Sequence, residues 1–258
     1  MKILITSGGT KVKIDLVRSI TNMSRGTFGS KICDAFWNKI IDSHKKSRSI
    51  KKECAWQESA DITFFYHKDS KLPNAEKRCN ELYDTSFRKI EYVPYDTFDD
   101  YRNDLKKLVL ENHYDIIVLA AAVSDYRVKE CYNGKYRSGD DMTIKLVKLP
   151  KVIKEIREIV PKSTVICGFK LLVNSTEREL EDAMMKQFKD NDIDLVVGND
   201  LRDIKADNHK LTLKTRYSEY FRIYEKKNHD LAKVVVDECL ECLTYKKKEF
   251  GDEVNDTF

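Results

Sequence analysis

Small polar residues and glycines follow the first apolar run of the sequence in a pattern that suits phosphate binding. Ser7, Gly8, Gly9 and Thr10 come directly after the run ILIT. Paired glycines let backbone N–H groups approach an anion closely, and the threonine hydroxyl adds a further donor. A tight turn is an equally good reason for two adjacent glycines. The segment therefore predicts either a phosphate cradle or a simple turn.

A second polar cluster, TNMSRGTFG, contains Asn22, Ser24, Gly26 and Thr27. Asn, Ser and Thr are favoured helix N-caps, so the cluster can simply begin a helix. The same free N–H groups, with the Asn22 amide, can instead hold a carboxylate or a phosphate. Spacing alone leaves both interpretations open. The sequence has neither GxGxxG nor GxxxxGK[ST], which argues against a standard NAD site and against a P-loop.

The elements that must position these residues alternate along the chain. Apolar runs predict strands at Lys2–Thr6, Ile62–Tyr66, Lys89–Pro94, Ile116–Val123, Thr164–Phe169 and Leu195–Gly198. Longer periodic stretches predict helices at Thr27–Ile41, Phe98–Glu111, Leu149–Ile159, Glu177–Asn191 and Asp230–Tyr245. This alternation is typical of a parallel sheet with helices on both faces, and ligands bind such sheets at the carboxyl ends of the strands.

The C-terminal part of the sequence follows a different pattern. Lys210–Arg216 and Tyr220–Tyr224 alternate between polar and apolar residues, which predicts an antiparallel edge hairpin. We therefore expect one α/β domain over residues 1–258. Its fold is Rossmann-like and doubly wound, and its mostly parallel sheet ends in a C-terminal antiparallel ribbon.

Composition excludes several classes of protein. Hydrophobic residues make up 41% of the 258 residues and charged residues 35%, which indicates a folded core under a heavily charged surface. The 47 basic and 43 acidic residues leave a net charge of +4, too balanced to indicate a nucleic acid or a membrane surface as partner. No apolar run approaches the roughly 18 residues of a membrane span, and the start does not resemble a secretory signal. We expect a cytoplasmic protein.

Seven scattered cysteines argue against a disulfide framework. Cys239 and Cys242 form a CxxC, but no second pair completes a zinc site. They lie inside a helical pattern, so we expect them to face the core.

Two segments interrupt the alternation of strands and helices. The polar and basic stretch 44–58, with KKSRSIKK inside it, is an insertion that reads as solvated surface or as a phosphate-binding patch. The second segment separates the strand ending at Val123 from the helix near Pro150. Its length of about 25 residues exceeds the usual 2–6 for such a loop. It predicts a flap over residues 127–148.

Five motifs occur in order between Met1 and about Asp200. They are ILITSGGT with the following ITNMSRGTFG, DIIVLAAAVSDY, a basic loop with GKYRS and TIKLVKLPKVI, GFKLLV, and DLVVGND. In this order they resemble the phosphopantothenoylcysteine synthetase family, the ligase of coenzyme A biosynthesis. Because the chain starts at the family's first strand, it resembles the monofunctional bacterial type, without the flavin-dependent decarboxylase domain. No flavin is expected.

The resemblance implies a two-step ligation. The carboxylate of 4′-phosphopantothenate attacks the α-phosphate of a nucleoside triphosphate, which releases pyrophosphate and leaves an acyl-nucleotidyl intermediate. The amine of L-cysteine then attacks the activated acyl carbon and releases the nucleoside monophosphate. Mg2+ is expected as the counter-ion of the triphosphate, although the resemblance assigns no metal ligand. CTP is the expected nucleotide, with ATP as the alternative, and the family implies a homodimer.

Two residues match catalytic positions of the family. Asn22 matches the asparagine at the acyl-phosphate, where a side-chain amide donates to the carboxyl oxygen. Lys135, in GKYRS, matches the lysine of a mobile flap that closes over the triphosphate. A helix cap for Asn22 and a solvated loop lysine for Lys135 are the alternatives.

The resemblance also implies a set of nucleotide-binding residues. These are Ser7, Gly8, Gly9, Thr10, Ser24, Gly26, Ala120, Ala121, Ala122, Asp125, Phe169, Lys170, Asn199 and Asp200. Gly198 replaces the alanine of the family's AND motif. Gln187 and Asn191 replace lysines that bacterial relatives carry on the preceding helix. These replacements affect the expected base and phosphate contacts but not the reaction class.

Two other classes of function compete with the ligase. A Rossmann-like oxidoreductase would need a glycine fingerprint that the sequence does not have. A non-catalytic nucleotide-binding protein would keep the fold and the pocket, but the presence of both Asn22 and Lys135 argues against it.

Overall fold

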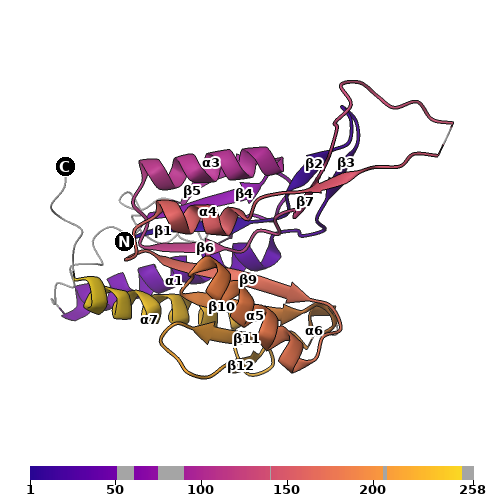
Figure 1. The fold of residues 1–258 in the computed structure, drawn as a ribbon. Coiled ribbons are helices and arrows are strands. Elements are labelled where there is room, and N and C mark those ends of the chain that lie inside the picture. Colours follow the sequence, from indigo (N-terminus) through magenta and orange to yellow (C-terminus); the bar gives the residue numbers. More distant parts are fainter. Residues whose placement is uncertain (51–60, 75–89, 140, 206–207, 252–258) are drawn as a thin grey trace.

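A computed structural model describes residues 1–50, 61–74, 90–139, 141–205 and 208–251. Its main sheet has eight strands in the order β12-β11-β10-β9-β6-β1-β4-β5 (Figure 1). These are β1 (Lys2–Ser7), β4 (Asp61–His67), β5 (Ile90–Tyr95), β6 (Ile116–Leu119), β9 (Val165–Leu172), β10 (Leu195–Asp200), β11 (Lys210–Thr215) and β12 (Arg222–Glu225). The pairs from β10 to β5 are parallel, and β11 and β12 add an antiparallel ribbon. The predicted fold class is confirmed.

Helices cover both faces of this sheet. They are α1 (Thr27–Ile50), α3 (Phe98–Glu111), α4 (Val152–Ile159), α5 (Glu177–Asn191), α6 (Leu201–Lys205) and α7 (Leu231–Phe250). Apolar residues of α1 and α7 pack on one face, and those of α3, α4 and α5 pack on the other. The sheet between them carries strands such as IIVL in β6, which is buried at every position. Such strands are expected where both faces of a parallel sheet are covered.

The helices α3 and α5 have the predicted bounds because each begins with a capping box. Thr97 accepts from the Asp100 N–H while the Asp100 carboxylate accepts from the Thr97 N–H, and Thr176 and Glu179 repeat this arrangement. Two otherwise unpaired backbone donors are satisfied at each helix start. Helix α4 begins later than predicted, after Lys151, because the residue before Pro150 is restricted to extended backbone.

Helix α1 is longer than predicted and ends at Ile50 rather than Ile41. The segment between these positions has neither glycine nor proline to stop a helix. The first part of the 44–58 insertion therefore continues α1, which corrects its assignment to an irregular connection. Residues 51–58 lie outside the described residues.

Two short ribbons that the sequence analysis did not predict lie beyond the end of β1. The strands β2 (Lys11–Lys13) and β3 (Ser19–Thr21) form one, and β7 (Tyr126–Val128) and β8 (Leu146–Lys148) form the other. The second ribbon is the root of an arm, described over residues 126–139 and 141–148, that extends away from the sheet (Figure 1). The segment predicted to be a flap thus begins and ends in the paired strands β7 and β8.

Hydrogen bonds tie the arm to the β2–β3 hairpin. The Leu16 N–H donates to the Gly134 carbonyl at 3.0 Å, and the Tyr136 N–H donates to buried Asp15 at 3.1 Å. Burial alone would raise the pKa of Asp15, but the N–H groups of Val17, Arg18 and Tyr136 lower it to about 2. A charged carboxylate thus fastens the arm to the hairpin.

Helix α7 buries Cys239 and Cys242 against the sheet, as the sequence predicted. Across the described ranges, no helix is both long enough and apolar enough to cross a bilayer.

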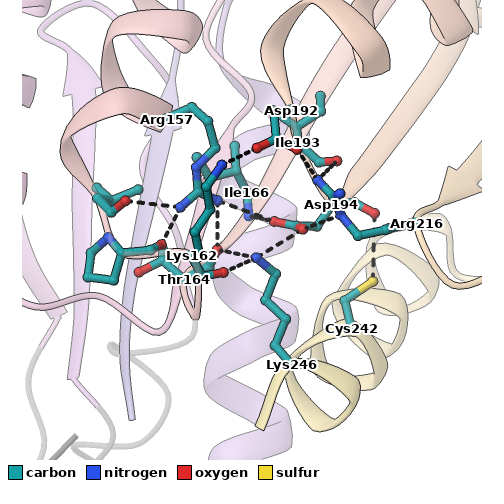
Figure 2. Close-up of polar contacts among 12 residues, drawn as sticks. Arg157, Lys162, Thr164, Ile166, Asp192, Ile193, Asp194, Arg216, Cys242 and Lys246 are labelled. Atoms are coloured by element: carbon teal, nitrogen blue, oxygen red, sulfur yellow. Dashed lines mark hydrogen bonds and ion pairs between the residues drawn. The ribbon is translucent and has the colours of Figure 1, made fainter. Parts of the chain in front are cut away.

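A buried cluster of charges joins α7 to the amino ends of β9 and β10 (Figure 2). Asp194 has no exposed surface and lies 3.0 Å from the Lys246 ammonium, 3.1 Å from Arg216 Nε and 3.7 Å from Arg157 Nη1. It also accepts the Ile166 N–H at 2.9 Å. Burial lowers the pKa of Lys246, and the nearby Asp194 carboxylate offsets this only in part. The cluster lies at the edge of the sheet opposite the carboxyl ends of the parallel strands.

Candidate functional site

A cavity of about 780 Å³ lies beside the carboxyl ends of β6 and β9, where parallel sheets bind their ligands. Helices α4 and α5 form its other walls. Six of the residues predicted from the sequence line it: Asn22, Ala121, Ala122, Asp125, Phe169 and Lys170. Parallel strands end at one edge, so these residues meet although up to 148 positions separate them in the chain. The cavity is large enough for a substrate of nucleotide size.

The Asn22 side chain is held in a fixed orientation. Its Nδ2 donates to the Ala122 carbonyl at 2.7 Å. An amide nitrogen carries two hydrogens, so the second can donate to a ligand in the cavity that Asn22 lines. The bond to Ala122 thus decides which end of the amide is the nitrogen.

The Ser7–Thr10 segment lies behind the cavity wall instead of lining it. A Cβ on Gly8, whose φ is 94°, would lie 2.0 Å from Ser70 Oγ, and one on Gly9 would lie 2.5 Å from the Asn22 carbonyl. Thr10 is fully buried, and its hydroxyl contacts Ser124 Oγ at 3.0 Å. The glycines are thus required for close packing of the loop, and direct phosphate binding by the segment stays a prediction.

The N-terminus of α1 has features that suit an anion. Its first turn contains no acidic residue, so nothing there offsets the positive end of the helix dipole. Gly26 has a φ of 69°, and its N–H donates to Ser24 Oγ at 3.4 Å. The Ser7 hydroxyl donates to the Gly26 carbonyl at 3.0 Å, which ties this turn to the end of β1. Neither Ser24 nor Gly26 lines the cavity, so their contact with a phosphate also stays a prediction.

Asp125 forms an ion pair at the rim of the cavity. The Lys151 ammonium lies 2.5 Å from Asp125 Oδ1, and more than half of each side chain is exposed. Both residues line the cavity. Lys151 and Lys154 were not among the site residues predicted from the sequence. The pattern that could have identified them is a pair of lysines, three positions apart, at the start of the helix that follows the flap.

Phe169 and Lys170 lie on β9, where helix α5 packs against the strand. Gln187 Nε2 donates to the Phe169 carbonyl at 3.2 Å, and Asn191 Nδ2 donates to the Gln187 carbonyl at 2.7 Å. The Phe169 ring also meets Phe28 of α1 edge to face at 6.0 Å. Two neutral amides of α5 thus line the cavity where many relatives are expected to carry lysines.

The cavity as a whole is cationic. Four lysines line it against two aspartates: Lys151, Lys154, Lys170 and Lys186 against Asp125 and Asp190. Such an excess of positive charge raises the local concentration of anionic ligands.

Ala120, Asn199, Asp200 and Lys135 do not line the cavity. Asn199 and Asp200 are buried at the end of β10, where Asn199 Oδ1 contacts His209 Nε2 at 2.9 Å. Hydrogen bonds from the Ser175 and Arg202 N–H groups and from the Ser175 hydroxyl lower the pKa of Asp200 to about 2. Asp200 thus joins the loop before α5 to the start of α6. Ala120 is half-buried just after β6, and Lys135 is exposed on the arm.

In the described part of the chain, no three His, Cys, Asp or Glu side chains are grouped to hold a metal ion. Asp125 is paired with Lys151, and the other cavity aspartate, Asp190, can supply a carboxylate of the kind that Mg2+ uses when substrate phosphates and water complete its shell.

Comparison with known proteins identifies relatives of this chain. Residues 1–41 and 85–243 match the family model of the DNA/pantothenate metabolism flavoprotein C-terminal domain. The coenzyme A biosynthesis bifunctional protein CoaBC of Thermococcus kodakarensis is 28% identical over 212 residues, covering 82% of this chain and 44% of that protein. The chain thus spans less than half of this relative. The unmatched residues 42–84 include the 44–58 insertion.

Solved structures show the same fold. A DNA/pantothenate metabolism flavoprotein from Streptococcus pneumoniae has 25% identity and a TM-score of 0.69, over 93% of this chain and 99% of that one. A Cab2 variant in complex with phosphopantothenate-cysteine has 19% identity and a TM-score of 0.74, over 97% and 88%. Because the family model matches most of the sequence, the chain belongs to the family of DNA/pantothenate metabolism flavoprotein C-terminal domains.

Proposed function

We propose that this chain joins 4′-phosphopantothenate to L-cysteine through an acyl-nucleotidyl intermediate, in coenzyme A biosynthesis. One observation carries the proposal beyond family membership. A single cationic cavity collects Asn22, the Ala121–Ala122 strand end, Asp125 and Lys170, which are positions matched to the synthetase motifs. The relative from Thermococcus kodakarensis is a coenzyme A biosynthesis protein. The proposed reaction involves no flavin.

In the first step, a carboxylate oxygen of phosphopantothenate bonds to the α-phosphorus and pyrophosphate leaves. Both reactants are anions, so their approach depends on the lysines around the cavity. Mg2+ on the triphosphate would offset further negative charge, and Asp190 is a cavity carboxylate that could hold it. The second N–H of Asn22 would donate to the acyl oxygen. In the second step, the cysteine nitrogen bonds to the acyl carbon, the nucleoside monophosphate leaves, and the amine loses a proton.

CTP is our proposed nucleotide, with ATP as the alternative. The test measures pyrophosphate release by purified protein with Mg2+ and 4′-phosphopantothenate, comparing CTP and ATP, with and without cysteine. We expect about one pyrophosphate per site without cysteine, because the intermediate stays bound, and continuous release of pyrophosphate and CMP with cysteine. If folded protein binds a triphosphate but releases no pyrophosphate, it is a nucleotide-binding protein instead.

Lys135 is proposed to bring positive charge to the triphosphate when the arm moves toward the cavity. Lys135→Gln should lower kcat by about 100-fold and change KM little. The reason is that the lysine charge is proposed to contact the triphosphate only in the transition state, so it contributes little to binding of the substrate. The control is Lys129→Gln, on the same arm, where Lys129 lies 3.5 Å from Glu130. Equal loss in the two variants would show that only the general charge of the arm matters.

A second copy of the chain is the proposed partner of the arm and its hairpin. Apolar side chains are exposed there, with Leu16 and Val17 each 66% exposed and Met23 96% exposed. Burial of such residues in a homodimer would remove them from water. Sedimentation should give twice the chain mass of 30.2 kDa, and the double variant Leu16→Glu/Val17→Glu should be monomeric. A wild-type monomer at micromolar concentration would overturn this proposal.

A further inference from the structure

The ion pair between Asp125 and Lys151 closes the root of the arm. Asp125 is the residue before β7, and Lys151 lies between β8 and α4, at the N-cap position of that helix. The Leu149 N–H donates to the Asp125 carbonyl at 2.8 Å, and Tyr126 pairs with Lys148 in the ribbon. The chain therefore enters and leaves the arm at one point, and the ion pair joins the two sides there.

The same two side chains face the cavity. Asp125 and Lys151 both line it, and their side chains are 56% and 58% exposed. An exposed ion pair adds little stability, because water solvates both charges well when they separate. Lys151 does not cap α4 with a side-chain hydrogen bond, so its ammonium can turn without disturbing the helix. This ion pair, which we call the clasp, can therefore separate so that each side chain contacts a new partner. The backbone hydrogen bond from Leu149 to Asp125 remains.

A polyphosphate is a stronger competitor for Lys151 than one carboxylate. It carries several negative charges, and its bonds to an ammonium are charge-assisted. The other lysines of the cavity, Lys154, Lys170 and Lys186, would draw it to the same place. We propose that Lys151 binds a phosphate group of the nucleoside triphosphate by leaving Asp125, whose freed carboxylate then accepts a ribose hydroxyl. Nucleotide binding thereby opens the clasp at the root of the arm.

This inference rests on the proposed function, because it assigns a phosphate contact for the same triphosphate. The probe is inorganic tripolyphosphate, which has no ribose, and its binding is measured by calorimetry at fixed ionic strength. Lys151→Met should raise its Kd at least about tenfold, as for a lost charge-assisted bond, and Lys151→Arg should restore most of the affinity. The matched control is Lys129→Met, an exposed and ion-paired lysine on the arm outside the cavity.

The exchange itself predicts a gain of affinity. Asp125→Asn should lower the Kd of tripolyphosphate about threefold, because Lys151 no longer has to leave a carboxylate. Removing a negative charge from the cavity favours any anion, so Asp190→Asn, in the same cavity, measures that general effect. The gain at Asp125 should exceed the gain at Asp190, and it should fall to the Asp190 level in a Lys151→Met background. A gain that persists without Lys151 would overturn the exchange.

The two proposals fail in different ways. If the wild type binds neither tripolyphosphate nor CTP nor ATP, both the ligase proposal and the proposed exchange at Lys151 are overturned. If the wild type ligates cysteine but Lys151→Met binds tripolyphosphate like the wild type, only the role of Lys151 is overturned.

Discussion

Asn22→Ala should reduce cysteine ligation by about 1,000-fold while changing triphosphate affinity less than about twofold. The amide donates to the acyl oxygen in this mechanism, and loss of one such donor costs about 100- to 1,000-fold in turnover. In the proposed mechanism the triphosphate does not depend on this bond, since the lysines that line the cavity would hold its charge. Pyrophosphate release gives the turnover, and calorimetry with CTP gives the affinity.

Two further variants separate catalysis from structure at this position. In the wild type the Ala122 carbonyl accepts a hydrogen bond from Asn22 Nδ2 at 2.7 Å. Asn22→Asp keeps the size of the side chain but places an oxygen against that carbonyl, so this variant should be as inactive as Asn22→Ala. Thr21→Val removes the hydroxyl of the neighbouring residue, which donates to the Thr10 carbonyl at 3.4 Å, and should affect turnover far less. Equal losses of nucleotide binding and ligation in Asn22→Ala would mean that Asn22 only holds the Ala122 strand end in place.

Asp194→Ala should lower the free energy of unfolding by about 3–5 kcal/mol, measured by urea denaturation. The substitution leaves Lys246 and Arg157 buried without their carboxylate, and an uncompensated buried charge is costly (Figure 2). It also removes the acceptor of the Ile166 N–H. Since native domains are stable by about 5–15 kcal/mol, this loss is a large share of the total.

Asp192 provides the matched control for Asp194. Its carboxylate pairs with Arg216 at 2.5 Å and with Lys162, but its side chain is 45% exposed. Asp192→Asn, which suits the left-handed backbone of this residue (φ 48°), should therefore cost no more than about 1 kcal/mol, as is usual for exposed pairs. Pyrophosphate release per folded molecule should be unchanged in both variants, because the cluster lies far from the cavity edge of the sheet. Similar losses of stability at the two positions would contradict the importance of burial.

The alternation of apolar runs and amphipathic stretches was sufficient to predict the sheet and its covering helices. The predicted starts of α3 and α5 are correct, and in the structure a capping box at Thr97 and another at Thr176 begin these helices. Helix α1 was predicted too short because a basic run is compatible with both a helix and a connection. The strands of the two ribbons at the arm have three residues each, which is too short for a periodic pattern to reveal them.

The candidate site was predicted in part for a similar reason. Parallel strands bring their carboxyl ends together, so Asn22, Asp125 and Phe169 lie at one cavity. Spacing does not say which way a side chain points, and Thr10 and Asp200 point into hydrogen bonds of the fold. Lys151 was missed because its importance comes from a carboxylate 26 positions away in the chain.

The buried cluster at Asp194 also bears on where this folding unit ends. The match to the family model stops at residue 243, but Lys246 lies beyond that limit and fills the space beside Asp194. A chain shortened to the limits of sequence similarity would lose the ammonium and keep the carboxylate in the core. A domain boundary taken from the family alignment would therefore separate Lys246 from the buried carboxylate that it pairs with. Expression designs should retain helix α7 to its end at Phe250.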